Sequence, residues 1–154
     1  MNDVEYFQRA FAYDDWANAG HLQGLAKNDS PAPEALRAMA HLLSARAIWL
    51  RRITGQPTEG MKFFPALDLA GCNDLHKQVV SDWQTWLAQA TPGQLTERVT
   101  FHDTHGTPYT LDRATMLTHV MLHSAHHRGQ VAMAQRQAGN APTDLDMYLS
   151  PLAQ

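Results

Sequence analysis

The sequence His119-Val-Met-Leu-His-Ser-Ala-His-His-Arg-Gly-Gln130 places four histidines within nine residues of a long helical pattern, and the rest of the chain is interpreted around it. The pattern runs from about Asp112 to Ala138, contains no proline and has apolar residues at helical spacing. At 3.6 residues per turn, His123 and His127 share the face that the apolar spacing directs into a core. Two inward imidazoles four residues apart either bind one metal ion or are satisfied by hydrogen bonds.

Two neighbouring histidines compete with this pair. His126 lies three residues after His123, but its direction on the helix differs from that of His127 by about 100°. His119 lies four residues before His123 and would form a rival pair with it. We favour His123 and His127 because they straddle the core direction, which leaves His119 and His126 on one flank of the helix.

Three further segments have apolar residues at helical intervals, at residues 4–26, 33–54 and 73–90. With the last helix they predict an all-α protein, a four-helix bundle of up-and-down or crossover connectivity. Residues 55–69 contain two prolines and two glycines and predict a long loop after the second helix. Two short strands around a glycine-containing turn predict a small β-hairpin before the last helix, with His102 and His105 exposed at the turn.

Length and composition favour one globular domain over residues 1–154, since 44% of the residues are hydrophobic and 18% are charged. The formal net charge of −3 provides no basic surface for nucleic acid. No run approaches the roughly 20 apolar residues that a membrane span requires. A single cysteine and an acidic N-terminus without a signal-peptide pattern lead us to expect a cytoplasmic protein.

His41 lies well inside the second helical segment, close to its predicted buried face. Taken alone, a histidine at such a place is more often a hydrogen-bonded core residue than a metal ligand. The pair formed by His123 and His127 lacks a third ligand, however. His41 is therefore a candidate for completing an open three-ligand site of the kind that catalytic metals occupy.

Polar residues interrupt the apolar stripe of the first helix. We expect the carboxylates of Asp14 and Asp15 to be solvated, whereas Asn18 lies near the stripe and needs a partner. The alternative is that these residues reach the metal cavity and act on a ligand or as a base. Arg128, which follows His127, is expected to pair with a carboxylate at the surface rather than to bind a substrate.

Two single residues have local interpretations. Cys72 lies at the start of a helix, where a thiol can be acidified, but a lone cysteine is more simply a bystander. Gly129 lowers the helix propensity by roughly 1 kcal/mol relative to alanine, which suggests that another backbone approaches there.

The loop and the C-terminal tail carry aromatic residues with two interpretations each. Phe63 and Phe64 form either a pocket wall or a plug at the end of the core. The tail that contains Asp146 and Tyr148 is expected to pack back on the helices. There, these two residues either close the cavity or contact another subunit.

These motifs resemble those of the DinB-like family of metal-binding four-helix bundles, the bacterial damage-inducible proteins related to YfiT-like proteins and thiol S-transferases. The resemblance is strongest in His123-Ser-Ala-His-His-Arg-Gly-Gln130 of the last helix. It extends to His41-Leu-Leu-Ser-Ala-Arg-Ala-Ile-Trp-Leu-Arg-Arg-Ile53 and, more weakly, to Tyr13-Asp-Asp-Trp-Ala-Asn18. It implies a metal site formed by His41, His123 and His127, zinc or nickel as the usual occupant, and a homodimer.

The resemblance also implies an activity. Similar proteins transfer low-molecular-weight thiols to electrophiles, and one isomerises maleylpyruvate with the thiol as cofactor. A divalent ion on three neutral imidazoles keeps its full charge and has room for a thiol or water, whose pKa it lowers. We therefore expect a metal-dependent thiol S-transferase-like enzyme or thiol-dependent isomerase with a small-molecule substrate. The alternatives are a metal-dependent hydrolase and a non-catalytic bundle that binds a metal or a small molecule.

Overall fold

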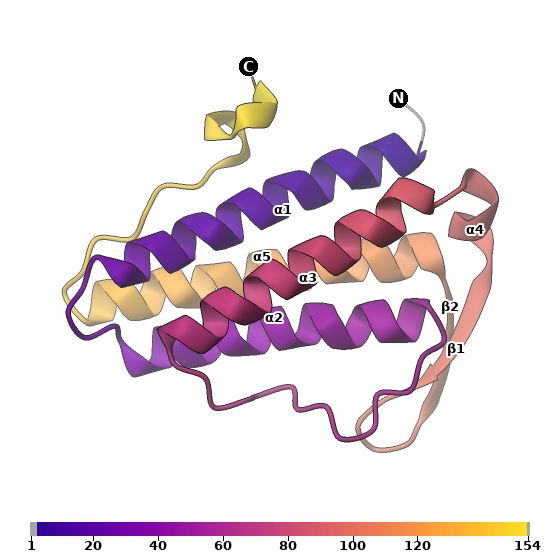
Figure 1. The fold of residues 1–154 in the computed structure, drawn as a ribbon, viewed down its shortest axis with the longest axis horizontal. Coiled ribbons are helices and arrows are strands. Elements are labelled where there is room, and N and C mark those ends of the chain that lie inside the picture. The colour runs from indigo at the N-terminus through magenta and orange to yellow at the C-terminus, as the bar shows by residue number, and fades with distance from the viewer. Residues whose placement is uncertain (1–2, 154) are drawn as a thin grey trace.

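The computed structural model describes residues 3–153 and contains four long helices that lie side by side (Figure 1). They are α1 (Asp3–Ala26), α2 (Pro33–Ile53), α3 (Leu69–Gln89) and α5 (Arg113–Gln137). A short helix, α4 (Pro92–Thr96), and two antiparallel strands, β1 (Arg98–His102) and β2 (Pro108–Asp112), connect α3 to α5. The tail contains two short 3-10 turns, η1 (Met147–Leu149) and η2 (Pro151–Ala153). The prediction of a mainly helical protein with a small hairpin before the last helix is confirmed.

Local sequence signals set the ends of the helices. Pro33 occupies the first turn of α2, where a missing N–H breaks no helical hydrogen bond. The side chain of Asp112 accepts a hydrogen bond of 2.8 Å from the backbone N–H of Thr115 and caps α5. Gly139 follows α5 with a φ of 80°, a conformation that favours glycine. None of the described helices is both long enough and apolar enough to cross a membrane.

One helix boundary and one short helix differ from the predictions. Helix α3 begins at Leu69, four residues before the predicted start, because the carboxylate of Asp68 caps it by accepting a hydrogen bond from the N–H of Gly71. Residues 92–96 form α4, which the sequence analysis did not predict; a capping box between Thr91 and Gln94 stabilises it. The long loop after α2 is therefore residues 54–68.

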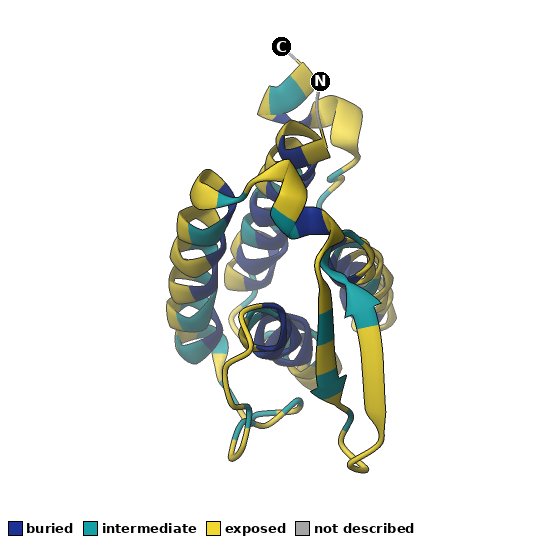
Figure 2. Ribbon diagram, turned by 90° about the vertical axis from the view of Figure 1, so that its right-hand side faces the viewer, coloured by how far each residue is buried: buried dark blue, intermediate teal, exposed yellow. Residues whose placement is uncertain are grey.

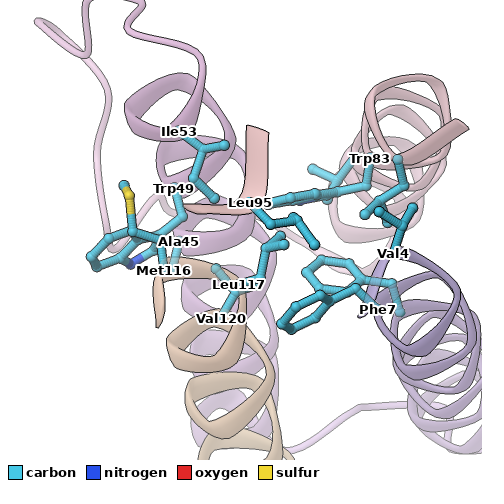
Figure 3. Packing of buried hydrophobic residues seen from close by; sticks show 13 residues of the cluster. Val4, Phe7, Ala45, Trp49, Ile53, Trp83, Leu95, Met116, Leu117 and Val120 are labelled. Carbon is cyan, nitrogen blue, oxygen red and sulfur yellow. The ribbon is translucent and has the colours of Figure 1, made fainter. Parts of the chain in front are cut away.

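Each long helix packs against two others around a largely apolar interior. Helix α2 contacts α3 and α5, and α1 contacts the same two helices. Their buried faces point toward one another and their exposed faces point outward (Figure 2). One apolar cluster, at the hairpin end, includes Trp83, Leu117 and Val120 (Figure 3). A second cluster, toward the other end of the helices, includes Leu43 and Val131.

A polar layer, made of Asp14, Asp15, Asn18, Arg46 and Arg128, lies between the two apolar clusters. All five side chains are buried. Asp14 of α1 forms ion pairs with Arg46 of α2, at 3.2 Å, and with Arg128 of α5, and Arg46 also binds Asp15 at 2.7 Å. The expectation of solvated carboxylates was wrong, because arginines from two other helices neutralise them in the interior. Arg128 does pair with a carboxylate, but not at the surface.

The C-terminal tail packs back on the helices, as expected, and runs along α1 (Figure 1). The hydroxyl of Tyr13 donates a hydrogen bond of 3.0 Å to the carbonyl of Leu145. Leu145 also covers Gly20, where a Cβ atom would collide with the leucine side chain. The close approach expected at Gly129 is absent, since no described atom outside the neighbouring turns of α5 lies within 4 Å of a Cβ built there.

Candidate metal centre

The structure brings together the three histidines that the sequence analysis singled out. His41 of α2 and His123 and His127 of α5, which we call the histidine triad, meet where these two helices pack. The Nε2 atom of His123 lies 3.2 Å from that of His41 and 3.1 Å from that of His127. One ring nitrogen from each residue lies within 4.8 Å of the other two. The three side chains can therefore reach one small ion.

The triad lies at the margin of the core rather than inside it. His41 is buried, whereas His123 and His127 are half-buried. The residues that follow them on α5, Ser124 and Arg128, point into the interior instead and are 0% and 8% exposed. The prediction that the imidazoles point inward is thus correct only in part. Because the triad lies at the margin of the core, solvent can reach it.

Two oxygen atoms orient the imidazole rings. The Nδ1 atom of His41 lies 2.7 Å from the carbonyl oxygen of Phe63 in the loop, and Nδ1 of His127 lies 2.7 Å from Oε1 of Gln130. An oxygen acceptor requires a proton on Nδ1, which leaves the lone pair on Nε2. In both residues Nε2 is the atom that faces the other histidines, so the rings are oriented as metal ligands are.

Burial keeps the triad neutral. Burial, and after it the charges of the neighbouring imidazoles, lower the pKa of His123 to about 3. Burial is also the main cause that lowers the pKa of His41 and of His127 below the ordinary value of 6.5. All three imidazoles are therefore unprotonated at pH 7, which is the form that binds a metal ion.

The arrangement fits a divalent cation. Tetrahedral zinc, with Zn–N bonds of about 2.0–2.1 Å, holds its nitrogen ligands about 3.3–3.4 Å apart. The distances from Nε2 of His123 to Nε2 of His41 and of His127, 3.2 Å and 3.1 Å, are close to this value. Three imidazoles suit zinc or nickel. Among the described residues, no carboxylate or thiol joins the group. A bound ion would therefore have positions left for a small ligand.

The remaining histidines of α5 and the hairpin stand outside the triad. His119 packs against Trp49, with the ring centroids 4.4 Å apart, and His126 is exposed. His102 and His105 are also exposed, as predicted. Helical direction, which favoured His127 over His126, therefore agrees with the structure.

A pocket of about 470 Å³ opens beside the triad. His41 and His127 line one side of it, and Phe64 from the loop stacks on His41 with the ring centroids 4.0 Å apart. The sequence left two interpretations for Phe63 and Phe64, a pocket wall and a plug at the end of the core, and each fits one of the two residues. Phe64 forms a pocket wall, whereas Phe63 packs against the apolar cluster at the hairpin end.

Three other candidates lie away from the pocket. Asp146 and Tyr148 line a separate cavity of about 830 Å³ between α1, α5 and the tail, so they do not close the pocket beside the triad. Cys72 is buried in the first turn of α3, and burial raises the pKa of its thiol to about 11. Because this thiol stays protonated near neutral pH, the bystander interpretation of Cys72 fits better than an acidified nucleophile.

Helical architecture and site together define a class: a mainly helical protein with a candidate three-histidine metal centre shared by two helices. Residues 9–153 match the DinB family, and the chain belongs to that family, as its motifs predicted. Among solved structures, a DinB-like protein from Bacillus cereus ATCC 10987 is similar, with a TM-score of 0.65 and 21% sequence identity. The similarity covers 91% of this chain and 95% of that chain, and it shows a common fold. No curated protein matches the chain.

Proposed function

We propose that this DinB family member is a four-helix bundle that binds zinc or nickel on His41, His123 and His127. We further propose that it adds a low-molecular-weight thiol to a small electrophile, or uses such a thiol in an isomerisation. The observation that carries the proposal is the convergence of three neutral Nε2 atoms beside an open pocket. Family membership supports it.

The chain's own residues hold and orient the reactants in this proposal. When bound, a divalent cation supplies the positive charge that lowers the pKa of a thiol and makes its sulfur nucleophilic near pH 7. The neutral imidazoles would hold the ion without cancelling that charge. The carbonyl of Phe63 and the carboxamide of Gln130 keep two of the rings in place. The pocket, with Phe64 and Met133 in its wall, has space for the small molecule.

The first experiment measures metal content by mass spectrometry in protein prepared without a polyhistidine tag. We expect about one divalent ion per chain in the wild type and loss of the ion in His41→Ala and in His127→Ala. His126→Ala is the matched control, because this neighbouring histidine lies outside the triad, and it should retain the ion. Absence of metal, or metal that survives both ligand substitutions, would overturn the proposal.

The second experiment separates thiol chemistry from the alternatives. Cobalt-loaded protein is titrated with 2-mercaptoethanol, and a sulfur-to-cobalt charge-transfer band is expected in the near ultraviolet. Monobromobimane then serves as an electrophile whose thiol adduct is counted by mass spectrometry. An ester is tested as a further substrate, and its hydrolysis without thiol addition to monobromobimane would favour a hydrolase. Metal binding without turnover of the ester or of monobromobimane would favour a non-catalytic bundle.

The homodimer implied by the family resemblance stays a prediction. Sedimentation velocity over a range of protein concentrations tests it directly. We expect a species of twice the chain mass, and a monomer at all concentrations would contradict the prediction.

A further inference from the structure

We propose that the pocket beside the histidine triad binds metal ligands that carry a carboxylate, and that Arg37 is the residue that recognises this carboxylate. The inference rests on the proposed metal site and deepens it, because it names a substrate class. Its basis is the position of Arg37 in the pocket, the chemistry of the neighbouring side chains and the exposure of the guanidinium.

Arg37 lies one helical turn before His41 on α2, and both residues line the pocket. The guanidinium carbon of Arg37 is 5.4 Å from the centroid of the Phe64 ring, and Phe64 stacks on the imidazole of His41. The cation and the metal ligand therefore contact the same aromatic side chain. A small molecule that binds an ion on the triad and is long enough to pass Phe64 would therefore meet the guanidinium.

Charge in this pocket is concentrated on two residues. Among the described residues that line it, Arg37 is the only cation and Glu34 the only carboxylate. Their charged groups lie 3.8 Å apart, with side chains 66% and 77% exposed. An ion pair that is so exposed contributes little free energy, so a substrate carboxylate can replace Glu34 at little cost. The planar fork of a guanidinium matches a carboxylate.

Three other arginines have structural partners that occupy them. Arg46 and Arg128 are buried in the polar layer, and Arg52 donates a hydrogen bond of 3.0 Å to the carbonyl of His102 while it packs against Trp49. Among the residues that the structure describes, Arg37 is anchored only by the exposed ion pair with Glu34 and by the face of Phe64. Its guanidinium is thus available for a ligand.

The experiment compares pairs of thiols on cobalt-loaded protein by absorption spectroscopy. Mercaptoacetate, 3-mercaptopropionate and 6-mercaptohexanoate are each paired with the alcohol of the same length, so that only the carboxylate differs. The wild type should bind at least one acid about three- to tenfold more tightly than its alcohol. Arg37→Gln should abolish this preference and leave the affinity for the alcohols unchanged.

Two further variants sharpen the test. Glu34→Gln removes the competing carboxylate and should increase the preference for the acid. Arg136→Gln removes an exposed cation from α5 that lines a different cavity, and it should leave the preference as in the wild type. Circular dichroism and metal content verify that each variant is folded and loaded. No preference at any length, or a preference that survives in Arg37→Gln, would overturn the inference.

Failure of the proposed thiol chemistry gives a different result. If the loaded protein binds neither member of any thiol pair, thiol chemistry is excluded, and glutarate and butyrate replace the thiols as probes. One carboxylate of either compound can bind the cobalt, but only glutarate has a second one for Arg37. Preference for glutarate that Arg37→Gln removes would support the inference, and equal affinities would overturn it. Protein that binds no cobalt would overturn both proposals.

Discussion

The Nδ1 atom of His127 lies 2.7 Å from Oε1 of Gln130, and this contact leaves Nε2 as the ring nitrogen that faces His123. Gln130→Leu removes the acceptor, so we expect metal affinity to fall by about 10- to 100-fold. The fold should be retained, because Gln130 is exposed. Competition with a chromophoric chelator measures the affinity. Gln137→Leu, in the same pocket, is the matched control, and equal loss in both variants would contradict the orienting role of Gln130.

His21 makes stability depend on pH. It is 5% exposed, and burial, followed by the charge of Arg128, lowers its pKa to about 4. Between about pH 6.5 and pH 4 the unfolded chain therefore binds a proton that the folded chain does not bind. The free energy of unfolding should consequently fall as the pH decreases through this range.

Urea denaturation at several pH values, with a chelator present to remove bound metal, measures this dependence. His21→Gln should show a shallower fall than the wild type. Some dependence should persist, because burial also lowers the pKa of His76 to about 4. The same slope in the variant and in the wild type would show that His21 does not contribute.

At the scale of the helices, α1 contributes no residue to the triad but joins the two helices that do. Asp14 forms ion pairs with Arg46 of α2 and Arg128 of α5. Asp14→Asn would leave two buried guanidinium groups without this charge, and we expect stability to fall by about 3–5 kcal/mol. Asp15→Asn should cost less, because Asp15 pairs with Arg46 at the edge of the layer. Chemical denaturation compares the two variants, and similar losses would contradict this central role of Asp14.

Periodicity in the sequence was sufficient to predict the long helices, because the spacing of apolar residues is a local property. The start of α3 was misplaced, since Asp68 lies between Pro65 and Gly71, which resemble a continuing loop. Helix α4 was missed because five residues are too few to show a period, although the capping pair Thr91 and Gln94 was a signal that could have revealed it.

The candidate site was predictable to a similar extent. His123 and His127 are close in sequence, so helical geometry paired them. His41 is distant in sequence; it was a candidate because that pair lacked a third ligand, and the family resemblance supported the choice. The ion pairs of Asp14 could not be derived from one helix, because burial of a carboxylate depends on partners that other helices supply. The carbonyl of Phe63 left no signal in the sequence, since every residue has a carbonyl group.

For the whole molecule, a metal ion on the triad would link α2 to α5. At a free concentration about 100 times the dissociation constant, it would add about 2.7 kcal/mol to the stability. For a chain of this size, that corresponds to a rise in melting temperature of about 5–10 °C. Calorimetry with and without zinc or nickel measures the shift. His127→Ala should show almost none, and an equal shift in this variant would place the ion elsewhere.

The polar layer also limits how the helices can slide along their axes. An interior made only of leucine and valine tolerates a slide by one turn, about 5.4 Å, because one apolar side chain can replace another. Here the same slide would carry Arg46 or Arg128 away from Asp14 and into an apolar cluster, where an unpaired charge is strongly unfavourable. The polar layer therefore fixes the axial positions of α2 and α5 relative to α1. In this way the layer aligns His41 of α2 with His123 of α5, although no covalent link joins the two helices.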